Sequence, residues 1–247
     1  VHITGLTIGL AGITTQVVDD VVVYSTVSLT SESMRGVELS GFSLVEGAVL
    51  SDNAVGLGSN GGLLIRNEGD LTYFPNGGGT TQVGVYLESL AFETGTILHE
   101  MQVINECPAV INNGAGVQIQ QLNLDSNNGD VVNFGNLLVQ SRGSLLAEEL
   151  AYGIMVSDAT LGPNSNFNFV EISNELSFLE GGESTIGVDL SDVLLTGAIV
   201  SVRNNGTVSA PTGSGASNLQ LRGISARDVA VSNIQSSVLF SATGDME

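Results

Sequence analysis

The fold predicted from this sequence rests on one stretch, Val117-Gln118-Ile119-Gln120-Gln121-Leu122-Asn123-Leu124. Each half alternates apolar with polar residues, which is the pattern of a short β-strand with one buried face. Gln120 and Gln121 separate the halves, so the chain must turn there if all the apolar side chains are to stay on one side. The stretch therefore predicts two short strands that meet at a corner.

The same eight-residue pattern occurs seven times along the chain. The copies start 31 to 48 residues apart, at Val1, Val37, Val85, Val117, Ile154, Val188 and Leu219. Self-similarity at such a period is the sequence signature of a repeat architecture. A second alternating segment follows several copies and ends in a polar turn, as at residues 63–69, 137–143 and 200–206. Each repeat is therefore expected to be a closed circuit of short strands.

The repeats lack any convincing helix of ten or more residues, which argues against leucine-rich, ankyrin and helical-pair repeats. Residues 144–152 (SLLAEELAY) form the best helical segment. They take the place of a strand in other repeats, so we expect a strand or a single helical turn. A β-sandwich or jelly roll remains an alternative, but neither needs a sevenfold period. We predict an all-β fold, a parallel β-helix (β-solenoid) of about seven coils with protruding loops.

The charge balance restricts the partners. The chain has 26 acidic and 6 basic residues and a net charge of −20, and all six basic residues are arginine. No basic stripe exists for nucleic-acid phosphates or for anionic lipid, and no apolar run is long enough to span a membrane. We therefore predict no nucleic-acid partner and no membrane insertion. The absence of lysine suits a high-salt host or, equally, an extracellular surface rich in Ser, Thr and Asn.

Three glycine-rich segments interrupt the repeats and are expected to be surface loops, at residues 56–62, 75–81 and 210–218. Loops carry function more often than the scaffold that holds them, so these segments could line a groove or meet a neighbouring subunit. For each one taken alone, a solvated loop is the simpler interpretation.

One segment has the spacing of a metal-binding loop. Asp125, Asn127, Asn128 and Asp130 could gather oxygen ligands around calcium. Gly129 precedes Asp130, however, and no glutamate closes the loop as in an EF-hand. An Asn/Gly-rich turn is the better interpretation, and we predict neither a metal site nor a cofactor.

Carboxylate pairs are the candidates for polysaccharide chemistry, which needs two carboxyl groups at a fixed separation. They occur at residues 19/20, 148/149 and 189/192. Asp158 and Asp192 also occupy the fifth place of their copies, so stacked coils should make them neighbours. Other copies have Gly5, Gly41, Ser89, Gln121 and Gly223 at this place. The fifth place is therefore expected to be a solvated turn.

Nucleophilic and base catalysis have little support. His2 and His99 are the only histidines, and we expect His99 to be a surface or partly buried side chain. Cys107 is the only cysteine and is expected to be a buried, inert thiol. Arg66, Arg142 and Arg203 follow comparable segments and would form a sparse row that pairs with local acids. We therefore predict no catalytic residue, and the sequence leaves the binding residues unknown.

Three segments, VHITGLTIGL (1–10), VQIQQLNLDSNNGDVV (117–132) and LQLRGISARDVAVSNI (219–234), resemble coils of the right-handed parallel β-helix family. That family includes pectin-lyase-like enzymes and tailspike, fibre and other virion proteins of viruses of bacteria and archaea. The resemblance covers nearly the whole chain and implies a right-handed β-helix forming a single domain over residues 1–247. It is a likeness of fold pattern, so no catalytic motif is carried over.

The leading hypothesis is a virion surface structural protein, such as a spike, a fibre or a tail- or capsid-associated protein, rather than an enzyme. It would form a homotrimer or dock on other virion subunits, bind a host-surface glycan, and be located on the virion or extracellular surface. The alternatives are a carbohydrate-active enzyme (polysaccharide hydrolase or lyase) and a cell-surface adhesin. Because neither end carries a capping helix, we expect further chain or a partner to cover the ends.

Overall fold

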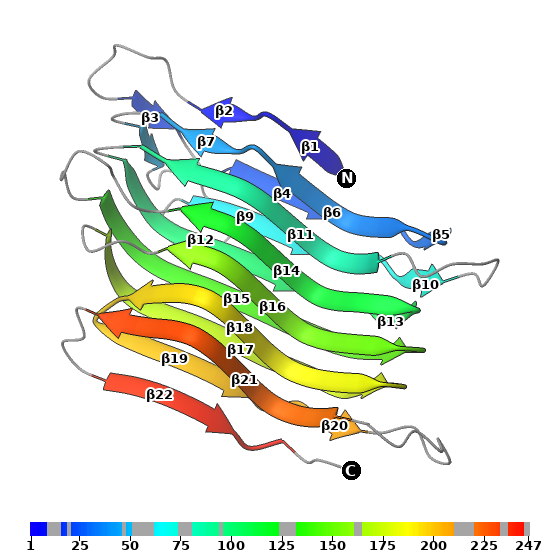
Figure 1. Ribbon diagram of the computed structural model, residues 1–247. Helices are drawn as coiled ribbons and strands as arrows, with labels where there is room; N and C mark the ends of the chain where they lie inside the picture. Colours follow the sequence, from blue (N-terminus) through cyan, green and yellow to red (C-terminus); the bar gives the residue numbers. More distant parts are fainter. Residues whose placement is uncertain are drawn as a thin grey trace.

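The computed structural model describes residues 1–8, 16–18, 21–45, 48–50, 62–73, 81–93, 96–123, 132–160, 165–209, 220–232 and 237–244. In this part of the chain all regular structure is β-strand, and the strands stack as coils of a right-handed parallel β-helix (Figure 1). The predicted fold class is thus confirmed. Residues 144–152 are strand at both ends with a bend between them, so the segment contains no helix.

Two parallel sheets form the walls of the coil. Sheet A has one rung for each copy of the motif, and its path is β1 (His2–Thr4), β6 (Met34–Ser40), β11 (Thr81–Phe92), β14 (Asn113–Asn123), β16 (Leu150–Thr160), β18 (Ser184–Thr196) and β21 (Gln220–Ser232). The short strands β2 (Thr7–Ile8) and β7 (Ser43–Leu44) continue its first two rungs.

Sheet B forms the return wall of the coil. Its path is β3 (Gln16–Val18), β8 (Ala48–Leu50), β12 (Ile97–Asn105), β15 (Val132–Ala147), β17 (Ser165–Gly181), β19 (Ile199–Asn204) and β22 (Ser237–Ala242). Shorter strands extend the same rungs, namely β4 (Val21–Ser25), β5 (Leu29–Ser31), β9 (Gly62–Asn67), β10 (Leu71–Tyr73), β13 (Ala109–Ile111) and β20 (Val208–Ser209).

Equivalent apolar residues stack in register inside the coil. Val85 pairs with Val37 on the preceding rung and with Val117 on the next rung, and Ile154 pairs with Val188. All five side chains are buried in the main core between sheets A and B. Because each rung repeats the pattern of its neighbours, the apolar alternation of the sequence becomes a continuous hydrophobic column along the axis.

The register of the seventh copy differs from the prediction. Val188 pairs with Ile224, so the last copy starts at Ile224, and Leu219 lies outside the described residues. The segment that begins at Leu219 alternates as well as the true copy does, and alternation alone cannot separate the two. The corner residue of this rung is consequently Asp228, and the assignment of Gly223 to that place was wrong.

The fifth place of every copy has left-handed backbone, which makes the predicted corner. The φ angles at this place lie between 51° and 65°, at Gly5, Gly41, Ser89, Gln121, Asp158, Asp192 and Asp228. A single residue in this conformation reverses the alternation of side chains, so the apolar residues on both sides of the corner face the core. Gly, Asp and other short polar residues adopt it at lower cost than branched ones.

A column of glycines stands directly before the motif, at Gly36, Gly84, Gly116, Gly153, Gly187 and Gly223. A Cβ atom on Gly187 would lie 2.0 Å from Oδ1 of Asn204 on the opposite wall. The two walls therefore approach so closely here that only glycine fits. This contact separates the main core from a second, smaller core that contains Cys107, Leu145 and Leu179.

Candidate functional site

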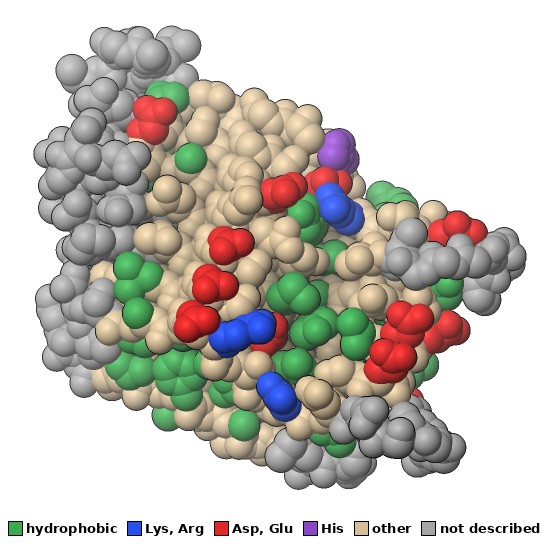
Figure 2. Space-filling view, viewed as in Figure 1, with side chains coloured by type: hydrophobic (Ala, Val, Ile, Leu, Met, Phe, Trp, Pro, Cys, Tyr) green, Lys and Arg blue, Asp and Glu red, His purple; other side chains and the backbone are tan. Residues whose placement is uncertain are grey.

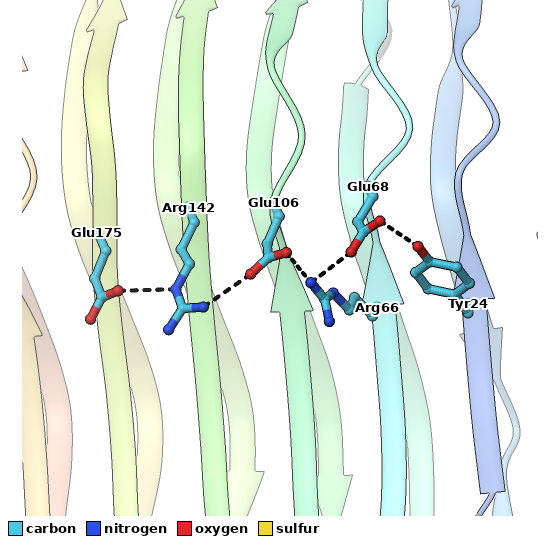
Figure 3. A network of polar contacts seen from close by, with 6 residues as sticks. All are labelled: Tyr24, Arg66, Glu68, Glu106, Arg142 and Glu175. Carbon is cyan, nitrogen blue, oxygen red and sulfur yellow. Dashed lines mark hydrogen bonds and ion pairs between the residues drawn. The ribbon is translucent and has the colours of Figure 1, made fainter. Parts of the chain in front are cut away.

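A chain of polar contacts runs along the outer corner of sheet B (Figure 3). Nη1 of Arg142 lies 3.0 Å from Oε1 of Glu106, and its Nε lies 3.0 Å from Oε2 of Glu175. Arg66 pairs with Glu106 on the other side and with Glu68 at 2.6 Å. The Tyr24 hydroxyl donates to Glu68 and ends the chain. The contacts thus link β4, β9, β12, β15 and β17.

The register of sheet B brings these groups together. Arg142 pairs directly with Glu175, and Glu106 directly follows Asn105, the rung partner of Ser141. Partial burial raises the pKa of Glu106, but hydrogen bonds and charges from Arg66 and Arg142 outweigh burial and place the pKa below its ordinary value. Burial alone would lower the pKa of Arg142, but its bonds to Glu106 and Glu175 outweigh burial and raise the pKa above its ordinary value. The contacts therefore favour the charged forms of Glu106 and Arg142.

The predicted pairing with local acids is confirmed for Arg66 and Arg142, and the predicted common row of the three arginines is wrong. Arg66 and Arg142 pair with acids, whereas Nε of Arg203 donates to Ser201 at 2.7 Å. Arg66 and Arg203 immediately precede the ladder position of their rungs, and Arg142 follows it. The three side chains therefore do not stack as one row, because Arg142 is displaced along its strand by two residues relative to Arg66 and Arg203.

A ladder of buried amides lines the inside of the same corner. Its members are Asn67, Asn105, Ser141, Asn174 and Asn204, all at equivalent places on successive rungs. Nδ2 of Asn67 donates to Oδ1 of Asn105 at 3.1 Å, and Nδ2 of Asn174 donates to Oδ1 of Asn204 at 2.7 Å. Among the described atoms, Oγ of Ser141 and Oδ1 of Asn174 are buried without a hydrogen-bond partner. Serine thus interrupts the ladder.

The sequence analysis missed this ladder, although the sequence carries a signal for it. A small polar residue recurs where an apolar one would continue the alternation, and a glycine stands directly before six of the seven motifs on the facing wall. Neither column is distinctive alone. Together they identify a close approach of the two walls that hydrogen-bonded amides fill.

The outer corner of sheet A carries a line of carboxylates. Asp158 and Asp192 are neighbours, as predicted, because Ser157 pairs with Ser191 and Ala159 with Val193. Asp228 extends the line by one rung and was missed through the register error. All three side chains are exposed, and Figure 2 shows acidic side chains in a line over β16, β18 and β21. Adjacent rungs of a sheet lie about 4.8 Å apart, so three like charges stand close together.

The rest of this outer face mixes aromatic, amide and charged groups. The guanidinium of Arg35 lies 3.7 Å above the ring centroid of Tyr86 and pairs with Glu38. The Tyr86 hydroxyl donates to Oε1 of Gln120 at 3.1 Å. Burial raises the pKa of Tyr86 and of Tyr152. The face therefore offers stacking surface and hydrogen-bonding groups side by side.

The remaining candidates lie outside the ion-pair network and the line of carboxylates, although the Cys107 thiol donates to Oδ1 of Asn105 in the amide ladder at 3.1 Å. Cys107 is buried, as predicted, and burial raises its pKa to about 11. His99 is exposed on β12, and Glu148 and Glu149 lie in the bend between β15 and β16. His2 pairs with Glu38 at 2.6 Å. The predicted turn at 125–130, the pair at 19/20 and the three glycine-rich loops, apart from Gly62 and Thr81, lie outside the described residues.

Across the described ranges, no group of three or more His, Cys, Asp or Glu side chains is placed to hold a metal ion. In the same ranges no helix is long and apolar enough to cross a membrane. Comparison with protein-family models, with curated proteins and with solved structures found no match.

Proposed function

We propose that this chain is a structural protein on the outside of a virion, of the spike, fibre or capsid-associated kind, that engages partners through the outer faces of its coils. The observation that supports this proposal best is the chain of contacts from Tyr24 to Glu175. It uses charged side chains to tie successive rungs together along the axis. Together with the buried amide ladder it makes a rigid rod whose polar groups stabilise the scaffold.

The charge of the chain suits assembly at high ionic strength. A net charge of −20 keeps separate chains apart through mutual repulsion. Salt weakens this repulsion, because at 0.1 M ionic strength charges more than about 10 Å apart are largely screened from one another. A particle built from such chains is expected to hold together best in concentrated salt.

The native mass in solution tests this proposal. Light scattering across low and high salt should show a trimer or a larger assembly that forms as salt rises. A monomer at every salt and protein concentration would overturn the structural assignment, because a self-assembling surface protein must associate under some of these conditions.

A second candidate function, polysaccharide cleavage or binding, is favoured by the line of Asp158, Asp192 and Asp228. The spacing of about 4.8 Å between rungs is close to the roughly 5 Å between carboxyl groups in retaining glycosidases. The test is release of reducing ends or unsaturated products from a panel of acidic and neutral polysaccharides. Asp192→Asn should abolish any activity, and Asp189→Asn on the same strand is the control. Equal activity in both variants would exclude the line as the active site.

A further inference from the structure

An exposed apolar strip lies outside the second core, on the part of sheet B formed by β13 and the C-terminal ends of β15 and β17. The strip consists of Pro108, Val110, Leu146 and Phe178. Val110 pairs directly with Leu146 on the next rung, and Phe178 follows on the rung after that, opposite Ser144. Val110 is 47% exposed, and Leu146 and Phe178 are each 39% exposed. Three adjacent rungs thus present large apolar side chains to solvent at neighbouring places.

The inward neighbours of these residues explain why the strip faces solvent. Ala109, Leu145 and Leu179 alternate with them along the strands and are buried in the second core. The core therefore fixes which side of each strand points inward, and the strip residues must point out. Contiguous apolar surface on a sheet face is a mark of an interaction site.

Carboxylates surround the strip. Asp70 lies beside Pro108 on the preceding rung, since the Leu71 amide donates to the Pro108 carbonyl at 3.1 Å. Glu180 pairs with Leu146 on the next rung, so a carboxylate borders the strip on that side as well. Glu148, Glu149 and Glu183 lie at the next bend of the chain, where Figure 2 shows acidic side chains gathered at the edge between sheets B and A. We call these five residues the acidic rim.

The acidic rim is not neutralised by the arginines of the described chain. The ion pairs found there join arginine to Glu38, Glu68, Glu106 and Glu175, and none of them involves the rim. The sequence contains no lysine, so a second copy would bring mostly further negative charge to this surface. Charge therefore favours a different occupant.

We propose that the strip and its rim bind a cationic segment of a partner protein, one in which lysine or arginine flanks apolar side chains. The apolar side chains of the segment cover Val110, Leu146 and Phe178, and its cations face Asp70, Glu180 and Glu183. Burial of apolar surface gives affinity, and the ring of carboxylates gives orientation and a fast encounter. The inference rests on this surface alone and does not require the virion assignment.

The test uses a short fluorescent peptide of alternating leucine and lysine as the probe, with anisotropy as the readout. The peptide should bind, and the double variant V110S/L146S should weaken binding by about tenfold. Val22→Ser is the matched control, because Val22 is 45% exposed on the outer face of β4, away from the strip. It should leave the affinity unchanged.

Charge is tested separately from apolar contact. Glu180→Gln with Glu183→Gln should weaken binding in about 0.05 M salt and have little effect in about 0.5 M salt, where charges are screened. Asp189→Asn, which removes a carboxylate on sheet A away from the strip, is the control and should leave peptide binding unchanged. A peptide of alternating leucine and glutamate should not bind.

Three results would overturn the proposal: equal binding of the leucine–glutamate peptide, equal loss in V110S/L146S and Val22→Ser, or unchanged binding in V110S/L146S. Light scattering on V110S/L146S gives a further check. If this variant abolishes self-assembly, the occupant of the strip is a second copy and the cationic assignment falls. If assembly persists while peptide binding is lost, the strip is a partner site distinct from the contacts of the assembly.

Discussion

The two corners of each coil turn the chain by different means. On sheet A the corner is one residue with left-handed backbone, and its identity varies among glycine, serine, glutamine and aspartate. On sheet B the corner holds a buried amide inside and an ionised network outside, and the inner residue is asparagine in four of the five ladder places. A corner formed by backbone conformation leaves its side chain available to solvent. A corner formed by side-chain bonds fixes its residue and demands glycine on the facing wall.

Among the residues that form the two corners, the glycines that face the amide ladder should be the most sensitive to substitution. Gly187→Ala places a Cβ atom 2.0 Å from Oδ1 of Asn204 and 2.6 Å from the carbonyl of Gly223, neither of which can move freely. We expect a loss of about 3 kcal/mol in the free energy of unfolding, measured by urea denaturation. Gly5→Ala is the control. It meets nothing within 4 Å and should cost only about 1 kcal/mol for its left-handed backbone. Equal losses would mean that wall contact does not explain the glycine column.

Removal of one ladder amide should have the next largest effect. Asn105→Ala removes the acceptor for Nδ2 of Asn67 and for the Cys107 thiol, and it leaves the amide of Asn67 with only the Gly69 carbonyl at 3.3 Å as acceptor. The expected destabilisation is about 2 kcal/mol by urea denaturation. Asn205→Ala, one residue beyond the ladder and exposed, should cost below about 0.5 kcal/mol. Similar losses of unfolding free energy in the two variants would mean that the ladder contributes little to stability.

Substitution at the sheet A corner should stabilise the protein, in contrast to the two substitutions above. Asp192→Gly removes a left-handed aspartate and one of three stacked carboxylates. Both changes should stabilise the fold, by about 1 kcal/mol together, with the larger gain in low salt. The thermal midpoint at low and high salt measures this gain. Destabilisation at both salts would show that the aspartate makes a structural contact.

The outer network of sheet B should contribute least, because its groups are partly exposed. Glu106→Gln is expected to cost below about 1 kcal/mol at pH 7. The pKa of Glu106 is lowered in the folded protein, so its contribution is present above the ordinary pKa of 4.5 and is lost as pH falls through the folded value. Urea denaturation at pH 7 and in acid should therefore show a gap between wild type and variant that closes at low pH. A gap that widens in acid would contradict the lowered pKa.

The apolar pattern of the sequence correctly predicted the features that follow from burying side chains in a core. Val85, Val117 and Ile154 had to face a core, and the fifth place of each copy had to turn. The pattern failed at the seventh copy, where Gly223 directly before Ile224 would have given the register if the glycine column had been recognised. The partners of Arg66 and Arg142 were predicted only as local acids. Which acids they reach depends on how rungs align across sheet B, and the sequence between rungs varies too much to show that alignment.

The interruption of the amide ladder at Ser141 has a consequence for unfolding. In a one-dimensional stack each rung is stabilised by its neighbours, so a weak junction between rungs marks a boundary between cooperative blocks. Ser141 lies between a bonded pair formed by Asn67 and Asn105 and another formed by Asn174 and Asn204. Arg142 pairs with Glu106 and Glu175 across this rung, so a variant without Arg142 is expected to open as two blocks on either side of β15, with amide protons exchanging at two distinct rates.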